Sequence, residues 1–514
     1  MDRKFGFLRK KLELRKYQDR EKKFILVMID ALGYDTLMDL KGSKYLPFLS
    51  KLMTRYNVTS YNVGIPTTTP YVQAGLFYNY NKIIPGFRFR DKKKKWDMST
   101  ADPEVAYYLE SLLKEKNKGI LEGGSSLGNM FTGGAERNLF TFPGMHANSR
   151  ITNVRDVLQV LVFNPFSIPR VLYYMVKDFF VEFYENIDDQ LKKKKGDFVN
   201  WFFFYPFFPF FRFAINGFVR EVLTEAAILE MKRKSPKICV NFHGFDWISH
   251  YRGANKKSSF LALKEIDKKL EWLYKSAKKE GYDFYVFSDH GIVPGVPFDK
   301  LYNQSLLEFV TRVKEKKREV RDKNWDYISY KLSYLHENFS LPLRVVNTFL
   351  KGIFKVKKKS KKVEQISVGK ASCIAHIYFN DKEHRLDLSE IENLHPGVVD
   401  KLVNHDGIGL VIGMEKGEMK VLSKEKDVLR KYGDAKWLEN SLKSFVKMKY
   451  FGDLFILGAI KDGKIVTFED FHMATHDGFG LNQEKGFFLS EEKYNFSDSE
   501  DSRVLYSVFN KTYK

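Results

Sequence analysis

The chain has 514 residues, of which 44% are hydrophobic and 29% charged, and this composition indicates a folded globular protein and excludes a disordered one. Lysine and arginine exceed aspartate and glutamate by 86 − 64 = 22, so we expect anionic partners such as phosphorylated substrates, nucleic acid or an anionic lipid surface. Cys239 and Cys373 both lie in apolar stretches, which argues against a disulfide framework and favours a reducing compartment.

The first predicted strand is the apolar run of residues 24–29, and it ends on Asp30. Such a run is typical of a strand buried on both faces of a parallel sheet, and open α/β sheets bind their ligands at the carboxyl ends of the strands. Residues 1–20 form a basic lead-in without the apolar core of a signal peptide, so we expect a cytoplasmic protein. Residues 45–56 have helical spacing, and residues 58–63 predict a second strand.

Three threonines, Thr67 to Thr69, precede Pro70 at the start of a predicted helix that continues to Phe77. Threonine hydroxyls at this place can cap the helix. They can also supply a nucleophile, because backbone N–H groups and the helix dipole favour an anion there. The glycine-rich residues 123–129 match no phosphate-binding loop and follow no clear strand, so we expect a tight surface turn.

Residues 151–218 differ in composition from the rest of the chain. Apolar residues from Val171 to Phe183 recur at helical spacing, and Lys192–Lys195 precede an aromatic run over residues 201–215. The run is interrupted by prolines and is shorter than the ~20 apolar residues of a transmembrane helix. Two interpretations stay open: a helical flank that packs on the core, or an interfacial contact with a membrane.

The next predicted strand, residues 238–242, leads into a turn with Asp246 and His250. Because these side chains are four residues apart, they share one face of a helix and can bind one metal ion. His243 precedes the turn, and we expect it to support a ligand or to face the substrate. A helix ending at Gly281 then leads to the buried strand of residues 284–287, which implies a parallel strand pair.

That buried strand ends on Asp289-His290, a second pair of metal donors at a strand end. Residues 300–362 are basic and mostly helical by pattern, and strands are predicted at residues 371–379, 409–414 and 464–468 and around residue 488. Before the last strand stand His472 and His476. The histidines between residues 376 and 405 have no paired acids at ligand spacing, so we expect ordinary surface or core roles for them.

Together these strand ends supply carboxylates and imidazoles for two mixed N/O metal sites, which zinc or manganese prefers. The order of motifs resembles the alkaline phosphatase superfamily, and within it a bacterial subgroup of the type I phosphodiesterase/nucleotide pyrophosphatase branch. The motifs that carry the resemblance are the strand-terminal Asp30, Pro66-Thr67-Thr68-Thr69, Asp246 to His250, Asp289-His290-Gly291 and His476-Asp477-Gly478. They cover roughly residues 22–300 and 450–490.

The resemblance implies an α/β/α sandwich around a mainly parallel sheet, with an inserted α+β cap subdomain. On this basis we expect a core that begins at residues 21–300, with residues 151–218 as a helical, aromatic-rich flank. The inserted subdomain would span residues 301–445, and residues 446–514 would close the core.

The resemblance also implies a role for each motif residue. Asp246, His250 and His476 would hold one divalent metal ion. The second ion would be held by Asp30, Asp289, His290 and the nucleophile, Thr69. The family has His-Gly where this chain has His476-Asp477, which leaves His472 as an alternative ligand. Thr68 is the alternative nucleophile or a substrate contact, and His243 is a second candidate for substrate binding.

The expected activity is hydrolysis of phosphodiester or pyrophosphate bonds with two divalent ions, zinc or manganese. One alternative is a head-group transferase or phospholipase-like enzyme at a membrane surface, which would act on a phosphorylated lipid and place the protein at the inner membrane face. Another is a non-catalytic basic protein that binds nucleic acid, although no part of the sequence matches a nucleic-acid-binding fold.

Overall fold

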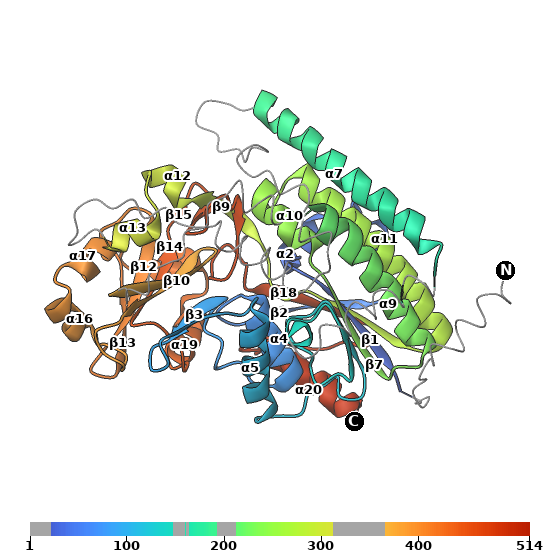
Figure 1. Ribbon diagram of the computed structural model, residues 1–514, viewed down its shortest axis with the longest axis horizontal. Coiled ribbons are helices and arrows are strands. Elements are labelled where there is room, and N and C mark those ends of the chain that lie inside the picture. The colour runs from blue at the N-terminus through green and yellow to red at the C-terminus, as the bar shows by residue number, and fades with distance from the viewer. Residues whose placement is uncertain (1–21, 147–159, 161–163, 193–211, 312–364, 514) are drawn as a thin grey trace, which may run out of the picture.

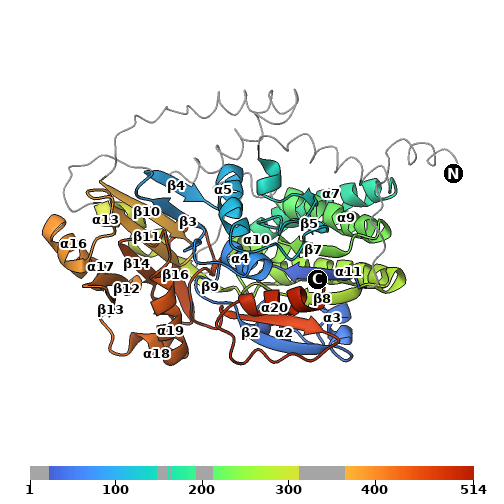
Figure 2. The ribbon, with the colours of Figure 1, turned by 90° about the horizontal axis from the view of Figure 1, so that it is seen from below.

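A computed structural model describes residues 22–146, 160, 164–192, 212–311 and 365–513 (Figure 1). The predicted lead-in, the lysines at positions 193–195, most of the aromatic run and most of the basic region before residue 362 lie outside the described residues. Figures 1 and 2 show two sheets side by side, with the larger one near the N- and C-terminal elements.

The larger sheet has seven strands in the order β2-β18-β8-β1-β7-β5-β6. Its strands are β1 (Phe24–Ile29), β2 (Asn57–Asn62), β5 (Ser125–Leu127), β6 (Arg137–Leu139), β7 (Lys237–Phe242), β8 (Asp283–Phe287) and β18 (Lys485–Ser490). The five strands from β8 to β6 are parallel, whereas β18 runs antiparallel to both β8 and β2. The mainly parallel sheet expected from the sequence is therefore confirmed.

Both faces of this sheet are covered, which is why β1 is an unbroken apolar run. Phe24, Leu26 and Met28 belong to one hydrophobic cluster, and the alternating residues Ile25, Val27 and Ile29 belong to another. Helices α4 (Thr69–Tyr78), α5 (Pro103–Lys114) and α20 (Arg503–Thr512) contribute to the first cluster. Helices α2 (Tyr34–Asp39), α3 (Pro47–Leu52), α9 (Arg220–Lys232) and α11 (Lys257–Glu280) contribute to the second. The result is the expected α/β/α sandwich.

The smaller sheet is antiparallel and has the order β10-β11-β14-β12-β13. Its strands are β10 (Ile366–Ala371), β11 (Ile374–Phe379), β12 (Ile408–Glu415), β13 (Glu418–Leu422) and β14 (Leu454–Gly458). The helices in this part of the chain are α12 (Phe298–Tyr302), α13 (Leu306–Thr311), α16 (Leu388–Leu394), α17 (Val398–Val403), α18 (Val428–Tyr432) and α19 (Ala435–Phe445). Because β14 lies beyond residue 445, this sheet also draws on the segment that we assigned to the closing part of the core.

Shorter strands connect the two parts. Strands β15 (Ile460–Lys461), β16 (Lys464–Thr467), β9 (Val293–Pro297) and β17 (Ala474–Thr475) form a four-stranded sheet in that order. A separate hairpin is formed by β3 (Arg88–Asp91) and β4 (Trp96–Ser99). Because β17 pairs with β9, the late part of the chain returns to the segment that directly follows β8.

Two local predictions were wrong. The strand predicted at residues 371–379 is β11, but it begins only at Ile374, because Ser372 adopts φ +49° and turns the chain between β10 and β11. The glycine-rich residues 123–129 do not form a surface turn, because they contain β5, which is buried between β7 and β6. A Cβ on Gly124 would lie 2.2 Å from the carbonyl oxygen of Lys237, so the missing side chain lets β5 approach β7.

The long helix α7 (Ser167–Lys192) and the π-helix η2 (Phe213–Val219) flank α9. Figure 1 shows α7 along the outer edge of the molecule, beside α11 and α10 (Gly244–Arg252). Among the described helices, none is long and apolar enough to cross a membrane.

Candidate active site

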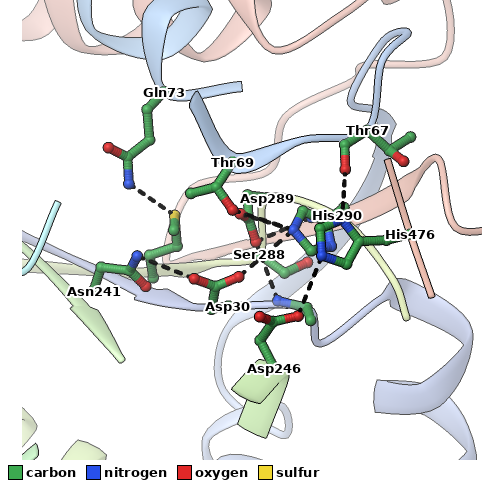
Figure 3. A network of polar contacts seen from close by, with 12 residues as sticks. Asp30, Thr67, Thr69, Gln73, Asn241, Asp246, Ser288, Asp289, His290 and His476 are labelled. Carbon is green, nitrogen blue, oxygen red and sulfur yellow. Dashed lines mark hydrogen bonds and ion pairs between the residues drawn. The ribbon is translucent and has the colours of Figure 1, made fainter. Parts of the chain in front are cut away.

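The carboxyl ends of three adjacent parallel strands meet at one edge of the larger sheet. β1 lies between β8 and β7. Asp30 directly follows β1, Asp289 and His290 come just after β8, and α10 begins two residues after the end of β7. In Figure 3 the side chains of Asp30, Asp246, Asp289, His290 and His476 point toward one another.

The first group of donors combines α10 with the late part of the chain. Asp246 and His250 lie one turn apart on α10, and Asp246 Oδ1 is 3.3 Å from His250 Nε2. His476, which directly follows β17, places its Nε2 atom 3.0 Å from His250 Nε2 and 3.5 Å from Asp246 Oδ1. One carboxylate oxygen and two imidazole nitrogens therefore converge on a single point.

The second group surrounds His290. Its Nε2 atom lies 3.5 Å from Asp30 Oδ1 and 3.2 Å from Asp289 Oδ2. The Thr69 hydroxyl lies 3.3 Å from the same nitrogen, at the N-terminus of α4. The rings of His290 and His476 stack with centroids 3.9 Å apart, so the two groups are continuous. The structure thus brings together the seven residues that the sequence analysis preferred as nucleophile or metal ligands.

The three histidines are oriented by backbone carbonyl oxygens. His250 Nδ1 lies 3.0 Å from Ala474 O, and His476 Nδ1 lies 3.2 Å from Thr67 O. His290 Nδ1 lies 3.2 Å from Gly291 O. A carbonyl oxygen can only accept a hydrogen bond, so in the neutral rings Nδ1 carries the proton and donates it. This leaves the Nε2 lone pairs directed into the group, as metal-ligating histidines require.

Each of the three aspartates in the two donor groups has a buried carboxylate oxygen without a hydrogen-bond partner in the described part of the chain: Asp30 Oδ1, Asp246 Oδ1 and Asp289 Oδ2. Each of them faces an imidazole Nε2 atom. A buried carboxylate without a donor is costly, and a bound cation would balance its charge. Carboxylate oxygens and imidazole nitrogens are also the ligands of zinc and manganese, so these residues could hold metal ions.

The pKa values of neighbouring groups in the site are shifted in opposite directions. Burial and the nearby Asp30 carboxylate raise the pKa of Asp289 well above its usual range. Burial, together with the neighbouring His476, lowers the pKa of His290 to about 4. Burial disfavours the charged form of His476, but the carboxylates of Asp477, Asp246 and Asp30 outweigh this effect and raise its pKa to about 10. Perturbations of this size, in residues that converge, are typical of functional sites.

The profile of the type I phosphodiesterase/nucleotide pyrophosphatase family matches residues 24–397. The chain belongs to this family. The match contains six of the seven converging residues, and His476 lies beyond its end. The chain is therefore a phosphoester hydrolase that acts on phosphorylated small molecules, and the non-catalytic, nucleic-acid-binding interpretation is set aside.

Similar solved structures include phosphonoacetate hydrolase from Sinorhizobium meliloti 1021 with phosphonoformate, at 12% identity, TM-score 0.44 and coverage of 96% of this chain and 97% of that chain. An inactive variant of murine ectonucleotide pyrophosphatase/phosphodiesterase 5 in complex with AMP gives 12% identity, TM-score 0.47 and coverage of 95% and 94%. The human counterpart gives 12% identity, TM-score 0.46 and the same coverage. No curated protein sequence matches the chain.

The departure from the family's His-Gly motif has a conformational explanation. Asp477 adopts φ +74°, the left-handed region that glycine occupies without strain and that aspartate tolerates better than most residues. Its Oδ1 atom also lies 3.0 Å from His476 Nδ1. The ring of His472 packs on that of His250 at 4.3 Å, whereas His476 Nε2 lies within 3.5 Å of both Asp246 Oδ1 and His250 Nε2. These distances favour His476 over His472 as the ligand.

The alternative site residues lie around the group. Thr68 is the N-cap residue of α4 and is fully buried, and Thr67 Oγ1 donates a hydrogen bond to Gly478 O. His243 lies behind Asp30: its Nδ1 atom is 2.8 Å from Asp30 Oδ2, and its Nε2 atom is 2.5 Å from Gly128 O. Burial disfavours a charged His243, but Asp30 outweighs this and raises its pKa.

Sequence reasoning missed the amide side chains that support the site. Asn241 donates to Asp30 Oδ2 at 3.3 Å. Gln73, one turn after Thr69 on α4, accepts a hydrogen bond from Met130 N and donates to Asn129 Oδ1. In the sequence, Asn241 could have been recognised as a polar residue near the end of an apolar strand. The structure shows that this strand, β7, pairs with β1, which leads to Asp30.

Proposed function

We propose that this chain hydrolyses phosphodiester or pyrophosphate bonds with Thr69 as the nucleophile beside two divalent metal ions. The observation that supports this most directly is the position of Thr69 Oγ1. It lies at the N-terminus of α4 and 3.3 Å from His290 Nε2, inside a buried group of carboxylates and imidazoles. A hydroxyl beside such a group can be activated as a nucleophile.

The two donor groups define which residues would hold the ions. Asp246, His250 and His476 would hold one ion, and Asp30, Asp289, His290 and Thr69 would hold the other. The mixed N/O donors favour zinc, with manganese as the alternative. When bound, the ions would neutralise charge on the phosphoryl oxygens and favour the ionised form of the threonine hydroxyl.

The chain's own groups then determine the reaction. The α4 N-terminus favours an anion at the position of the phosphoryl group, because its first backbone N–H groups point out of the helix. As the deprotonated Thr69 oxygen bonds to phosphorus, the bond from phosphorus to the leaving oxygen breaks, the leaving oxygen takes up a proton from water, and the phosphoryl group stays on Thr69 with its remaining substituent. Water then cleaves the Thr69 oxygen–phosphorus bond and restores the hydroxyl. His243 and Asn241 hold Asp30 in place throughout.

A phosphorylated lipid head group is the second substrate class, which would make the enzyme phospholipase-like or a head-group transferase. The observation that favours this class is the row of exposed apolar side chains on α7.

Thr69→Ala and Thr68→Ala form a matched pair that tests the nucleophile. We expect Thr69→Ala to abolish turnover of bis(p-nitrophenyl) phosphate while keeping the fold and at least one metal ion, since only one ligand is lost. Thr68→Ala should retain turnover within about an order of magnitude, equivalent to about 1.4 kcal/mol in the barrier. The reverse pattern would make Thr68 the nucleophile, and full activity in both variants would contradict the proposal. Comparison with p-nitrophenyl phosphate establishes the preference for diesters.

A further inference from the structure

The long helix α7 exposes a row of apolar side chains and buries Asp178 and Glu182, which is the reverse of an ordinary surface helix. It has 26 residues and is therefore about 39 Å long. Its apolar face consists of Ile168, Leu172, Tyr173, Val176, Phe180, Tyr184, Ile187 and Leu191, whose exposed fractions range from 42% to 80%. Lys192, the last residue of α7, is the only charged residue of this helix whose side chain is more than half exposed.

The opposite side of α7 is fixed to the protein by polar contacts. Glu182 is fully buried and pairs with Arg212 at 2.9 Å, and it also pairs with Arg252 of α10. Asp178 accepts a hydrogen bond from Asn216 of η2 at 2.9 Å. If α7 rotated to bury its apolar face, these charged groups would lose their partners, and breaking a buried ion pair is strongly destabilising. The apolar face is therefore held outward.

Ion pairs to neighbouring helices also hold other parts of α7. Near its start, Arg170 pairs with Glu221 of α9 at 2.8 Å, and in its middle Lys177 pairs with Glu265 of α11 at 3.0 Å. These ion pairs attach α7 to the helical layer behind it. Through the pair of Glu182 with Arg252, that layer includes α10, which also carries Asp246 and His250.

The chemistry of this face fits a lipid surface. A protein–protein interface has a polar rim with hydrogen-bonding groups around its apolar centre. The apolar face of α7 instead continues over the whole helix and ends at Lys192, the first of four consecutive lysines in the sequence. Each such lysine contributes about 1 kcal/mol near an anionic leaflet, and the chain as a whole carries a net charge of +22.

We propose that α7 lies in the plane of an anionic lipid bilayer and inserts its apolar face at the boundary between head groups and acyl chains. The inference concerns attachment, so it holds whether or not Thr69 is the nucleophile. If the proposed function is also correct, attachment brings the enzyme close to phosphorylated lipid head groups.

Vesicle sedimentation of the full chain tests this attachment. We expect the unaltered protein to sediment with vesicles of phosphatidylcholine and phosphatidylglycerol, and more weakly with phosphatidylcholine alone. The variant Leu172→Gln/Val176→Gln/Phe180→Gln should bind at least about tenfold more weakly, since each lost apolar side chain contributes to insertion. The matched control is Met38→Gln/Leu301→Gln/Leu394→Gln, which changes exposed apolar residues elsewhere and should bind like the unaltered protein. Equal binding of both variants, or no binding of the unaltered protein, would overturn the proposal.

A fluorescence measurement separates insertion from other occupants of the face. Cys239 and Cys373 are buried, so a thiol-reactive dye can be placed selectively on Leu172→Cys or, as a control, on Met38→Cys. Vesicles with brominated acyl chains should quench the dye at position 172 and leave that at position 38 unchanged. Equal quenching at both positions contradicts the proposal. A dimer that the triple α7 variant dissociates, without quenching at position 172, would assign the face to a second copy of the chain instead.

Discussion

The three candidate histidine ligands and Asp30 each have one atom held by its surroundings and another directed into the site. A backbone carbonyl oxygen holds Nδ1 of each of His250, His476 and His290, which leaves Nε2 directed into the site. His243 and Asn241 both contact Oδ2 of Asp30, so its Oδ1 atom is directed into the site. Such supporting contacts orient the ligands before an ion binds, which limits the entropy lost on binding.

The two donor groups should lose their ions separately. We expect the purified protein, loaded with zinc or manganese, to contain close to two divalent ions per chain. Asp289→Ala should lose the ion of the Asp30 group, and His250→Ala should lose the ion of the Asp246 group, each together with activity, because ligand number sets affinity. Elemental analysis of the dialysed proteins provides the measurement. His395→Ala, which removes an imidazole paired with Asp381 away from the site, should retain both ions. An unaltered protein that holds no ion would contradict the proposed function.

His243 should act on the metal through Asp30. Removing its imidazole in His243→Ala frees Asp30 Oδ2, and loss of such a supporting contact typically lowers metal affinity about 10–100-fold. Competition with a chromophoric chelator would detect this change without any substrate. His243→Asn, which keeps a donor on a shorter side chain, should lose less affinity than His243→Ala. A selective rise in KM with unchanged metal affinity would instead indicate that His243 contacts the substrate.

At the scale of elements, the buried strand β5 depends on the absence of a side chain at Gly124. An added Cβ would lie 2.2 Å from Lys237 O and 2.8 Å from Lys237 Cβ, both in β7. We therefore expect Gly124→Ala to reduce the free energy of unfolding by about 1–3 kcal/mol, the usual cost of overpacking. Thermal unfolding measures this loss. In the matched control Gly86→Ala, the nearest atom to the new Cβ is 3.6 Å away, so stability should not fall. Equal melting temperatures for both variants would show that β5 can shift away from β7.

The elements that build the site were predictable where one signal dominated. β1, β7 and β8 are apolar runs because both faces of the sheet are covered, and each ends on polar residues. β5 was missed because three residues with two serines carry no apolar pattern, and its place in the sheet depends on contacts with β7. β11 was predicted three residues too early, at residue 371, because the turn at Ser372 and Cys373 lies within an apolar stretch, and β10 was not predicted.

The residues of the site were predictable as motifs but not as contacts. Local spacing relates Asp246 to His250, whereas the contact between Asp30 and Gly128 through His243 joins three loops that only the folded sheet brings together. The outward apolar face of α7 was ambiguous for the same reason. Periodicity identifies an apolar stripe but does not tell which side packs on the protein.

At the scale of the whole molecule, a contact that should respond to acid joins the smaller sheet to the segment that follows α4. His376, in β11 of the smaller sheet, is fully buried, and its Nε2 atom lies 2.9 Å from Pro85 O in the segment between α4 and β3. On its other side, Gly452 N donates a hydrogen bond to Nδ1 at 3.2 Å. The ring must therefore be neutral, with its proton on Nε2 and a lone pair on Nδ1.

This junction should make the protein less stable as the pH falls from about 6.5 to 4. Burial lowers the pKa of His376 from 6.5 to about 4, so in this range the unfolded chain binds a proton that the folded chain does not. The contribution is present above pH 6.5 and is lost as the pH falls toward 4, with a total of order 3 kcal/mol. Urea unfolding at a series of pH values should show a shallower pH dependence in His376→Gln than in the unaltered protein. His384→Gln, at an exposed histidine of the same part of the chain, should retain the full slope. If the slopes of the unaltered protein and His376→Gln coincide, protonation of His376 does not weaken the junction between the two sheets.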